Sequence, residues 1–450
     1  MSISIDDLAE SLLTVTPTAL CGSVVRTAGM TAAVADFPAP VGAQVHIDRQ
    51  TGGPVAGEVI GFRDDLTLVY LLGETNGLRR GNRVRLVKTS RWLSVGRELL
   101  GRVINAEGRA IDGRPQPALE HRMALDRAAL VALERPRIDA PLSTGIRAID
   151  GMLTCGKGQR IGIFAGSGVG KSIALGMMSR YTAADVNVVA LVGERGREVN
   201  EFIQRDLGAG LAKSVVVVAT SDEPALARVR AAFTATTVAE YFREQGKDVL
   251  LVMDSLTRLA LAQREIGLAA GEPPTTRGFP PSVFGMLPRL LERAGRTAHG
   301  SITGFYSVLV EGDDPNEPIS DTVRGLLDGH AWLSRKLATR GHYPAIDVLE
   351  SVSRLMIEVV DTTHRAAAHT LRELMAVYRD HEDLISVGAY RAGSNPLVDR
   401  AIQMQSDINR FLRQGVDEAS SVSQARAALL ALVARAEQLA GSPPIAGGAR

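Results

Sequence analysis

The stretch GQRIGIFAGSGVGKSIALGMMSRYT, residues 158–182, decides how the chain folds. In it an apolar, β-branched run leads into a glycine-rich loop, then into a lysine and a serine, and finally into a helix-like pattern. Residues 165–172, AGSGVGKS, fit the P-loop pattern with alanine in place of its first glycine. The amides of such a loop and the N-terminus of the next helix form a cradle for phosphate groups. The stretch therefore predicts a strand, a phosphate-binding loop and a helix.

The residues of this loop have separate expected tasks. Glycines leave room for the backbone to approach a phosphate, because a Cβ would hinder that approach. Lys171 is expected at the β- and γ-phosphates of a nucleotide, and the Ser172 hydroxyl is expected to bind Mg²⁺. The residues expected to contact the nucleotide are Gly166, Ser167, Gly168, Val169, Gly170, Lys171, Ser172 and Ile173.

Two carboxylates follow other apolar runs that resemble strands. The run DVLLVMDS, residues 248–255, contains Asp254 at the end of the strand, where a Mg²⁺-supporting group of a P-loop enzyme should lie. The run VGERGREVNEF, residues 192–202, places Glu194 at the same predicted sheet edge, where a carboxylate could polarise the water that attacks the γ-phosphate. From the spacing alone, a solvent-exposed charged loop is an equal alternative for Glu194.

The hydrophobic pattern predicts three domains. Short β-rich segments in residues 1–92 predict a small barrel or sandwich of four to six strands. Residues 93–364 contain apolar strands that alternate with helical stretches, which is typical of a parallel α/β sheet with helices on both faces. Residues 94–115 are interpreted as a turn-rich connector within this part. Residues 365–450 have helical periodicity, with a disordered tail expected from about residue 441.

Composition limits the class of protein. The net charge is only +1, which does not favour binding to nucleic acid. The two cysteines, Cys21 and Cys155, fall in different predicted domains, so a disulfide framework is not expected. The N-terminus is acidic and does not have the pattern of a secretory signal, and no apolar run is long enough for a membrane span. We therefore expect a cytoplasmic protein.

Longer motifs resemble those of a known family. They include GERGREV, MDSLTRLALAQREIGLAAGEPPTTRGFPPSVF, GSITGFYSVLVEGDDPNEPISDTVRGLLDGH, RGHYPAIDVLESVSR and GAYRAGSNPLVDRAI, and they cover most of residues 90–410. The chain resembles the ATPases of bacterial flagellar (type III) protein export, which are related to the α and β subunits of F-type ATP synthases. The resemblance implies an N-terminal β-barrel, a RecA-like nucleotide-binding domain and a C-terminal helical domain. It also implies an ATPase that uses ATP and Mg²⁺.

The resemblance assigns further roles by position. Glu194 matches the catalytic glutamate, Arg195 a neighbour that contacts phosphate, and Glu198 an acidic position of the same motif. Asp254 matches the aspartate on the Mg²⁺ side, acting through water, and Arg258 an arginine near the γ-phosphate.

Two further roles concern residues near the end of the nucleotide-binding domain. The resemblance implies that Tyr343 stacks on adenine and that Arg354 is an arginine finger for a neighbouring subunit. From spacing alone, core packing would be preferred for Tyr343 and a surface salt bridge for Arg354. In the ATP synthase relatives the glutamate and the finger come from different chains, whereas here one chain has both. Identical copies in a head-to-tail ring would complete every site, so a homohexamer is expected.

Other expected partners also come from the resemblance. They are a regulatory, stator-like protein at the N-terminus, a central stalk protein, the membrane export gate, and export chaperones with flagellar cargo, at the cytoplasmic face of the inner membrane. The N-terminal segment offers only a brief apolar set for the regulator, namely Ile3, Ile5, Leu8, Leu12 and Leu13. The main alternative is the ATPase of a virulence-type secretion system. An RNA-translocating helicase, a non-hydrolysing subunit and a proton-driven ATP synthase subunit are less favoured.

Overall fold

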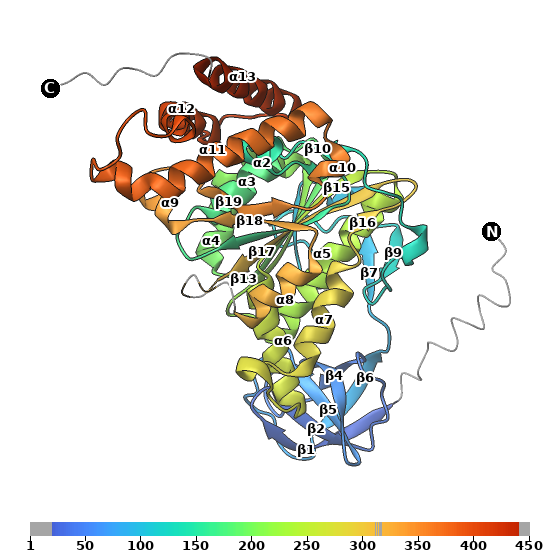
Figure 1. Cartoon of the computed structure of the whole chain (residues 1–450). Helices are drawn as coiled ribbons and strands as arrows, with labels where there is room; N and C mark the ends of the chain where they lie inside the picture. Colours follow the sequence, from blue (N-terminus) through green and yellow to red (C-terminus); the bar gives the residue numbers. More distant parts are fainter. Residues whose placement is uncertain (1–19, 311, 313, 315–316, 441–450) are drawn as a thin grey trace.

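The computed structural model describes residues 20–310, 312, 314 and 317–440, which form three domains in a row (Figure 1). A small barrel lies at one end, a sheet covered by helices lies in the middle, and a helical domain lies at the other end. The predicted fold class is therefore confirmed. The apolar set predicted near the N-terminus and the tail predicted from about residue 441 lie outside the described residues.

Six strands close the N-terminal barrel in the order β1, β2, β5, β4, β3 and β6, and β6 pairs with β1. Their bounds are β1 (Cys21–Ala28), β2 (Thr31–Ala35), β3 (Gln44–Ile47), β4 (Val55–Arg63), β5 (Leu66–Leu71) and β6 (Arg83–Lys88). Side chains alternate between the two faces, as in β6, where Val84 and Leu86 are buried and Arg83 and Arg85 are exposed. Closure pairs every strand, so the barrel has no free edge.

The middle domain is built on a nine-stranded sheet. The order is β19, β18, β12, β17, β15, β13, β14 and β8, with the short β16 paired to β17. The bounds are β8 (Arg102–Asn105), β12 (Arg160–Ala165), β13 (Val186–Glu194), β14 (Ser214–Thr220), β15 (Asp248–Asp254), β16 (Gly295–Arg296), β17 (Ser301–Leu309), β18 (Gly329–Leu333) and β19 (Ile346–Ser353). Only β16 and β19 pair antiparallel within this sheet. The loops after the parallel strands therefore meet at one edge.

Helices cover both faces of this sheet, so its strands are buried on both sides. In β15, Leu250 and Val252 face the side of α3 (Lys171–Tyr181). On the other face, Val249 and Leu251 join the core formed with α5 (Ala225–Glu244), α6 (Leu256–Ala270) and α7 (Pro281–Leu291). This explains why the strands are continuous apolar runs rather than alternating ones.

The C-terminal domain consists of α11 (Thr362–Ser386), α12 (Pro396–Leu412) and α13 (Val422–Ala440), which pack on one another and on α2 (Arg147–Met152). In α11 the buried residues Ala367, Leu371 and Leu374 lie three or four positions apart, which places them on one helix face. Figure 1 shows this helical layer on the side of the sheet opposite the barrel.

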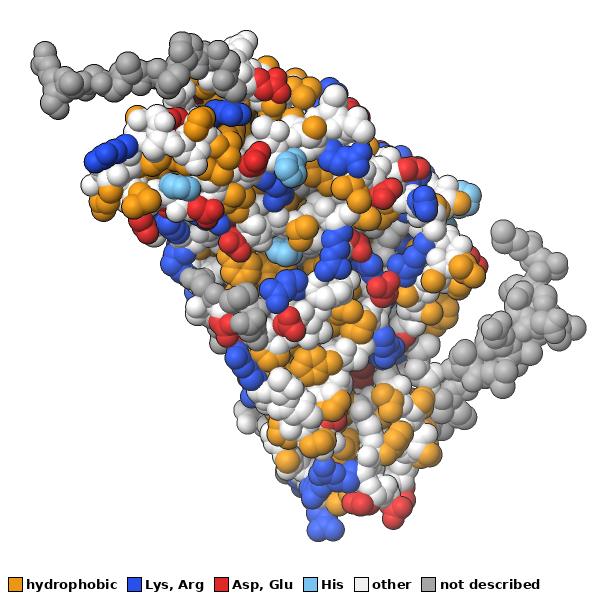
Figure 2. Space-filling model, viewed as in Figure 1, with side chains coloured by type: hydrophobic (Ala, Val, Ile, Leu, Met, Phe, Trp, Pro, Cys, Tyr) orange, Lys and Arg blue, Asp and Glu red, His pale blue; other side chains and the backbone are white. Residues whose placement is uncertain are grey.

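The interpretation of residues 94–115 as a connector is wrong in part, because β8 lies within them and pairs with β14. Ile104 is fully buried there, and the Arg102 guanidinium is paired with Asp112 at 2.7 Å, so this short edge strand has few apolar residues to reveal it. Figure 2 shows basic and acidic side chains interspersed over one face of the molecule, in agreement with the net charge of +1. Within the described part of the chain, no helix combines the length and the apolar character that crossing a membrane requires.

Candidate active site

The P-loop connects the end of β12 at Ala165 to the start of α3 at Lys171. Gly168 and Gly170 have φ angles of 77° and 89°, in the left-handed region that favours glycine. A Cβ on Gly170 would lie 3.3 Å from the ring of Tyr343, whereas a Cβ on Gly168 would meet nothing within 4 Å. The loop therefore has the backbone conformation for a phosphate cradle, with the N-terminus of α3 directed at it.

The side chain of Lys171 lies among carboxylates from two neighbouring strands. Its Nζ forms an ion pair with Asp254 Oδ1 and lies 3.9 Å from Glu194 Oε1. Ser307 of β17 donates a hydrogen bond of 2.6 Å to the same Asp254 oxygen. Because β12, β13, β15 and β17 are parallel, these side chains all lie at the carboxyl edge of the sheet. The structure thus brings the predicted lysine and both predicted carboxylates together.

Glu194 is 7% exposed, and its surroundings change its acidity. Burial, a hydrogen bond with Glu198 and the negative charge of Asp254 together raise the pKa of Glu194 to about 7, although Arg258 and Lys171 favour its ionised form. The same hydrogen bond lowers the pKa of Glu198, which therefore accepts it. A carboxyl group with a pKa near neutrality is suited to accept a proton from water.

Arg258 reaches Glu194 from the first turn of α6. Ser255, which follows Asp254 directly, caps this helix by accepting a hydrogen bond of 3.3 Å from the backbone amide of Arg258. The Arg258 guanidinium forms an ion pair with Glu194 Oε2. Gly193 has a φ of 72°, and a Cβ there would lie 3.2 Å from the Arg258 side chain, so this position requires glycine.

Tyr343 lies beside Gly170 of the P-loop, and its side chain is half-exposed. It lines a cavity of about 1080 Å³ together with Gln405, Ser406 and Asn409 of α12. A flat ring on one wall and polar side chains on another suit a planar heterocyclic base.

Arg354 is not part of this cluster. β19 runs antiparallel to β18, and Ser353 lies opposite Gly329. The backbone amide of Arg354 donates to Asp328, whose own amide donates to Arg160 at the start of β12. Arg354 is exposed and lies at the amino edge of the sheet, roughly 16 Å of strand away from the P-loop of its own chain.

The remaining predicted residues differ in their exposure. Gly166 and Val169 are buried, Ile173 is partly buried, and Ser167 and Ser172 are exposed at the loop. Arg195 points to solvent, with 78% of its side chain exposed, and pairs with Glu198 at 3.1 Å.

Two residues at this edge, Ser307 and Arg335, were not predicted from the sequence. Ser307 lies in a mostly apolar strand. Its polar character within that run is the signal in the sequence that could have identified it. Arg335, at the start of α9 (Arg335–Thr339), donates a hydrogen bond of 3.0 Å to the Ser167 carbonyl oxygen of the P-loop. It comes from 168 residues further along the chain, so no local pattern pointed to it.

The oxygen donors at the P-loop fit a magnesium ion. Ser172 offers a hydroxyl and Asp254 a carboxylate, which are ligand types that Mg²⁺ prefers. Within residues 20–310, 312, 314 and 317–440, no group of three or more His, Cys, Asp or Glu side chains could hold a metal ion by itself. A Mg²⁺ ion here would therefore take most of its other ligands from water and from the phosphates of a nucleotide.

Three family models match this chain. The nucleotide-binding domain of the ATP synthase alpha/beta family matches residues 145–353, and the beta-barrel domain of that family matches residues 22–87. The C-terminal domain of the EscN ATPase of type III secretion systems matches residues 360–431.

Individual proteins are similar over nearly their whole length. The chain is 51% identical to the flagellum-specific ATP synthase of Bacillus subtilis, over 87% of this chain and 90% of that protein. It is 50% identical to a type 3 secretion system ATPase of Xanthomonas euvesicatoria, over 89% of this chain and 91% of that protein. The solved structure of the assembled ATPase EscN from enteropathogenic E. coli is 45% identical, with a TM-score of 0.87, and covers 92% of this chain and 100% of that one. EscN has also been solved in complex with its central stalk EscO, with a TM-score of 0.84.

Proposed function

This chain belongs to the ATP synthase alpha/beta family, among the flagellum-specific ATP synthases and type 3 secretion system ATPases, and we propose that it is the ATPase of a flagellar protein-export apparatus. Its expected reaction is the hydrolysis of ATP to ADP and phosphate, used to deliver flagellar subunits for export. Relatives named as flagellar proteins support this assignment.

The residues at the carboxyl edge of the sheet support the following roles. Lys171 and the loop amides bind the β- and γ-phosphates, and Arg258 lies where it would approach the γ-phosphate. Glu194 accepts a proton from, or polarises, the attacking water. Ser172 and Asp254 would hold Mg²⁺, which would neutralise phosphate charge when bound. The ring of Tyr343 stacks on the base.

The single observation that carries the proposed mechanism is the separation of Glu194 from Arg354. Glu194 lies at the carboxyl edge of the sheet, and Arg354 lies at the amino edge of the same sheet. An arginine at that place can complete an active site only in another copy of the chain. We therefore propose a closed head-to-tail ring, a homohexamer, in which each chain supplies Glu194 to its own site and Arg354 to its neighbour's.

Mixing two inactive variants tests this arrangement. Glu194→Gln and Arg354→Ala should each abolish most ATP hydrolysis. An equimolar mixture should recover activity at about a quarter of the sites, because in a randomly mixed ring half of the chains have an intact Glu194 and half of their neighbours have an intact Arg354. Wild-type activity should also rise more steeply than in proportion to protein concentration. The measurement is the steady-state rate of phosphate release.

A second mixture is the control. Glu194 and Lys171 belong to the same site of the same chain, so mixing Glu194→Gln with Lys171→Ala should recover nothing. If Arg354→Ala is fully active, or if both mixtures behave alike, the shared site is wrong.

The remaining partners follow from the same proposal. Because EscN has been solved with its stalk EscO, we propose that a stalk protein occupies the centre of this ring as well. A regulator, the membrane export gate and export chaperones with cargo are proposed as further partners, with a location at the cytoplasmic face of the inner membrane. A virulence-type secretion ATPase is the alternative, because such a relative is nearly as similar. A deletion strain that still secretes hook and filament proteins would favour that alternative.

A further inference from the structure

A pocket of about 350 Å³ lies where the barrel meets the nucleotide-binding domain, away from the P-loop. Its walls come from the end of the barrel, from β7 (Trp92–Val95), from the turn after β8 and from α5. This volume lies within the range of about 300–1,000 Å³ that is typical of small-molecule sites. None of the residues proposed for ATP hydrolysis lines it.

Four cationic side chains line this pocket, namely Lys88, Arg91, Arg109 and Arg230. Arg230 is only 4% exposed, and its Nη atoms form ion pairs with Glu58 and, at 3.1 Å, with Glu107. Its Nε has no hydrogen-bond partner among the described residues, although it is buried. A buried guanidinium with an unused donor is costly unless another acceptor is available to it.

The positive charge of the pocket is not fully neutralised by its own carboxylates. Among the described residues, Arg91 pairs with Glu58 and Asp126, and Arg230 pairs with Glu58 and Glu107, whereas Lys88 and Arg109 form no ion pair. The pKa of Lys88 is lowered, first by its partial burial and then by the positive charges of Arg230, Arg109 and Arg122, with Glu107 acting in the opposite direction. Lys88 therefore experiences an excess of positive charge, which an anion would relieve.

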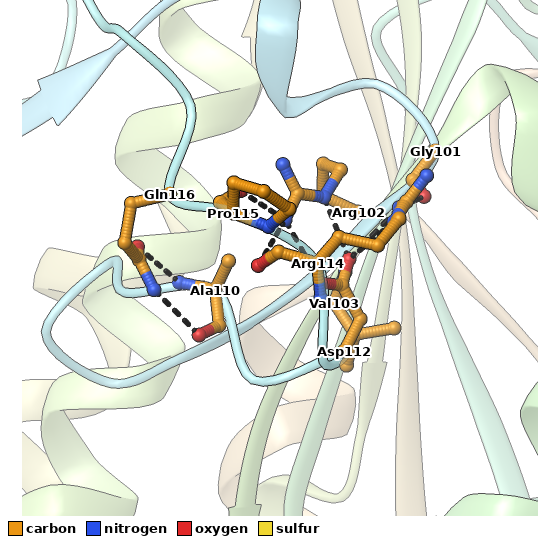
Figure 3. A network of polar contacts seen from close by, with 8 residues as sticks. All are labelled: Gly101, Arg102, Val103, Ala110, Asp112, Arg114, Pro115 and Gln116. Atoms are coloured by element: carbon orange, nitrogen blue, oxygen red, sulfur yellow. Dashed lines mark hydrogen bonds and ion pairs between the residues drawn. The ribbon is translucent and has the colours of Figure 1, made fainter.

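One wall of the pocket is held in place by the polar network in Figure 3. The Asp112 carboxylate accepts bonds from Arg102 at 2.7 Å and from Arg114 at 2.8 Å. The Gln116 amide closes the loop by pairing with both backbone groups of Ala110, at 2.8 and 2.9 Å. These bonds hold the backbone of the turn that carries Arg109, so the position of this wall is set before an anion binds.

We propose that this pocket binds a phosphate group, either free or as the ester of a small organic molecule. Guanidinium groups match phosphate oxygens in a bidentate manner, and Lys88 adds a point charge. The half-exposed ring of Trp92 offers a flat apolar face to the organic part of an ester. Because the lining side chains belong to the barrel and to the nucleotide-binding domain, a bound phosphate holds the two domains against each other. This inference goes beyond the proposed function and does not depend on it.

The fluorescence of Trp92 gives a direct test in the full-length chain. The chain has two tryptophans, Trp92 and Trp332, so Trp332→Phe makes emission a report on Trp92 alone. Titration with inorganic phosphate and with ribose 5-phosphate should give saturable changes, and sodium chloride at equal ionic strength should not. Both changes should persist with Lys171→Ala, which separates them from phosphate at the P-loop. Tighter binding of ribose 5-phosphate identifies an ester site, and equal binding identifies a site for free phosphate.

Substitutions that spare the buried Arg230 complete the test. Lys88→Gln combined with Arg109→Gln should weaken the apparent affinity at least about tenfold, because two charge-assisted contacts are lost. Arg79→Gln combined with Arg80→Gln, on the same barrel but outside the pocket, removes equal charge and should change nothing. The proposal is overturned if the emission change does not saturate with phosphate. It is also overturned if the apparent affinity is the same in the two double variants. The pocket would then be only an internal layer of salt bridges or a contact surface for another copy.

Discussion

Glu194 shows how much the chemistry of one residue depends on its immediate neighbours. It is a carboxyl group at the end of a buried strand, with two cationic neighbours, Lys171 and Arg258, and two acidic ones, Glu198 and Asp254. The negative neighbours and burial outweigh the cations, so its pKa rises to about 7. The same residue on an exposed loop would be ionised at all physiological pH values.

The pH dependence of hydrolysis should reflect this environment. Glu194 loses its proton as the pH rises through about 7, and only the carboxylate accepts a proton from water. We expect kcat/KM to rise with pH through this range and to level off above it. Glu198→Gln replaces an acceptor that raises the pKa with an amide donor, so the rise should move to lower pH.

The matched control is Glu201→Gln on the same helix, α4 (Gly196–Glu201), because among the described residues Glu201 forms its ion pair with the exposed Arg197, at 2.8 Å. It should leave the pH profile unchanged. A profile that is flat between pH 6 and pH 8 in all three proteins would exclude Glu194 as the titrating base.

The motif residues at the site could be predicted from the sequence, but their supporting contacts could not. Lys171 and Asp254 belong to spacings that the chemistry of phosphate binding demands, so pattern and resemblance both pointed to them. Ser307 and Arg335 act on that site from strands and helices more than 50 residues away in the chain. Only the register of the sheet and the packing of α9 bring them there.

At the scale of elements, α6 connects the candidate active site to the barrel. Asp254 is followed directly by Ser255, the N-terminal cap of the helix. The helix carries Arg258 in its first turn, and its C-terminal cap is Gly271, which has a φ of 91°. Farther along the helix, Glu265 accepts a hydrogen bond of 2.8 Å from Tyr70 of β5. Its 15 residues span about 22 Å, so one rigid element touches both domains.

Helix α12, which lines the cavity beside Tyr343, depends on its N-terminal cap. Asn395 Oδ1 accepts hydrogen bonds from the amides of Leu397 at 3.0 Å and Val398 at 3.4 Å. We expect Asn395→Ala to cost about 1 kcal/mol of helix stability, and Asn395→Ser to cost much less because serine also caps helices. Hydrogen–deuterium exchange in the first turn of α12 measures the effect. If both variants keep the protection of the wild-type protein, Pro396 and packing alone fix the helix start.

Elements that are buried on both faces could be predicted, and elements at the edges could not. The segments of β13, β14 and β15 are nearly continuous apolar runs, because helices cover both faces of the central sheet. β8 and β19 lie at the two ends of the strand order and carry polar residues in their patterns. Their strand character comes from pairing with a neighbour, which periodicity does not reveal.

At the scale of the whole molecule, the barrel is held to the nucleotide-binding domain by a buried ionic cluster. Glu58 of β4 is 3% exposed and pairs with Arg230 of α5 and, at 3.1 Å, with Arg91. The ion pair with Arg230 joins two residues that are 172 positions apart in the sequence. Among the described residues, removal of this carboxylate leaves Arg230 with Glu107 alone and Arg91 with Asp126 alone, and both of these remaining partners are more exposed than Glu58.

We therefore expect Glu58→Gln to destabilise the attachment of the barrel by about 3–5 kcal/mol, the usual cost of breaking a buried ion pair from one side. Urea unfolding followed by Trp92 emission, in the Trp332→Phe background, measures it where the two domains meet. Glu74→Gln, at an exposed position of the barrel, should leave the midpoint unchanged. Equal midpoints for the two variants would show that apolar packing alone holds the domains together.

The last helices of the chain complete a surface that the first part of the nucleotide-binding domain has already formed. The Gln414 side chain accepts a hydrogen bond from the backbone amide of Arg147 and donates one to the carbonyl oxygen of Gly145, both at 2.7 Å. The backbone amide of Val422 donates a hydrogen bond of 2.9 Å to the Ser143 hydroxyl. A ribosome adds about 5–20 residues per second, so the 269 positions that separate Gly145 from Gln414 take roughly 13–54 seconds to make. During this time the nascent chain presents the apolar surface around α2 to the cell without its cover. Translation speed and the chaperones near the ribosome exit thus become determinants of how much of this protein reaches its native state.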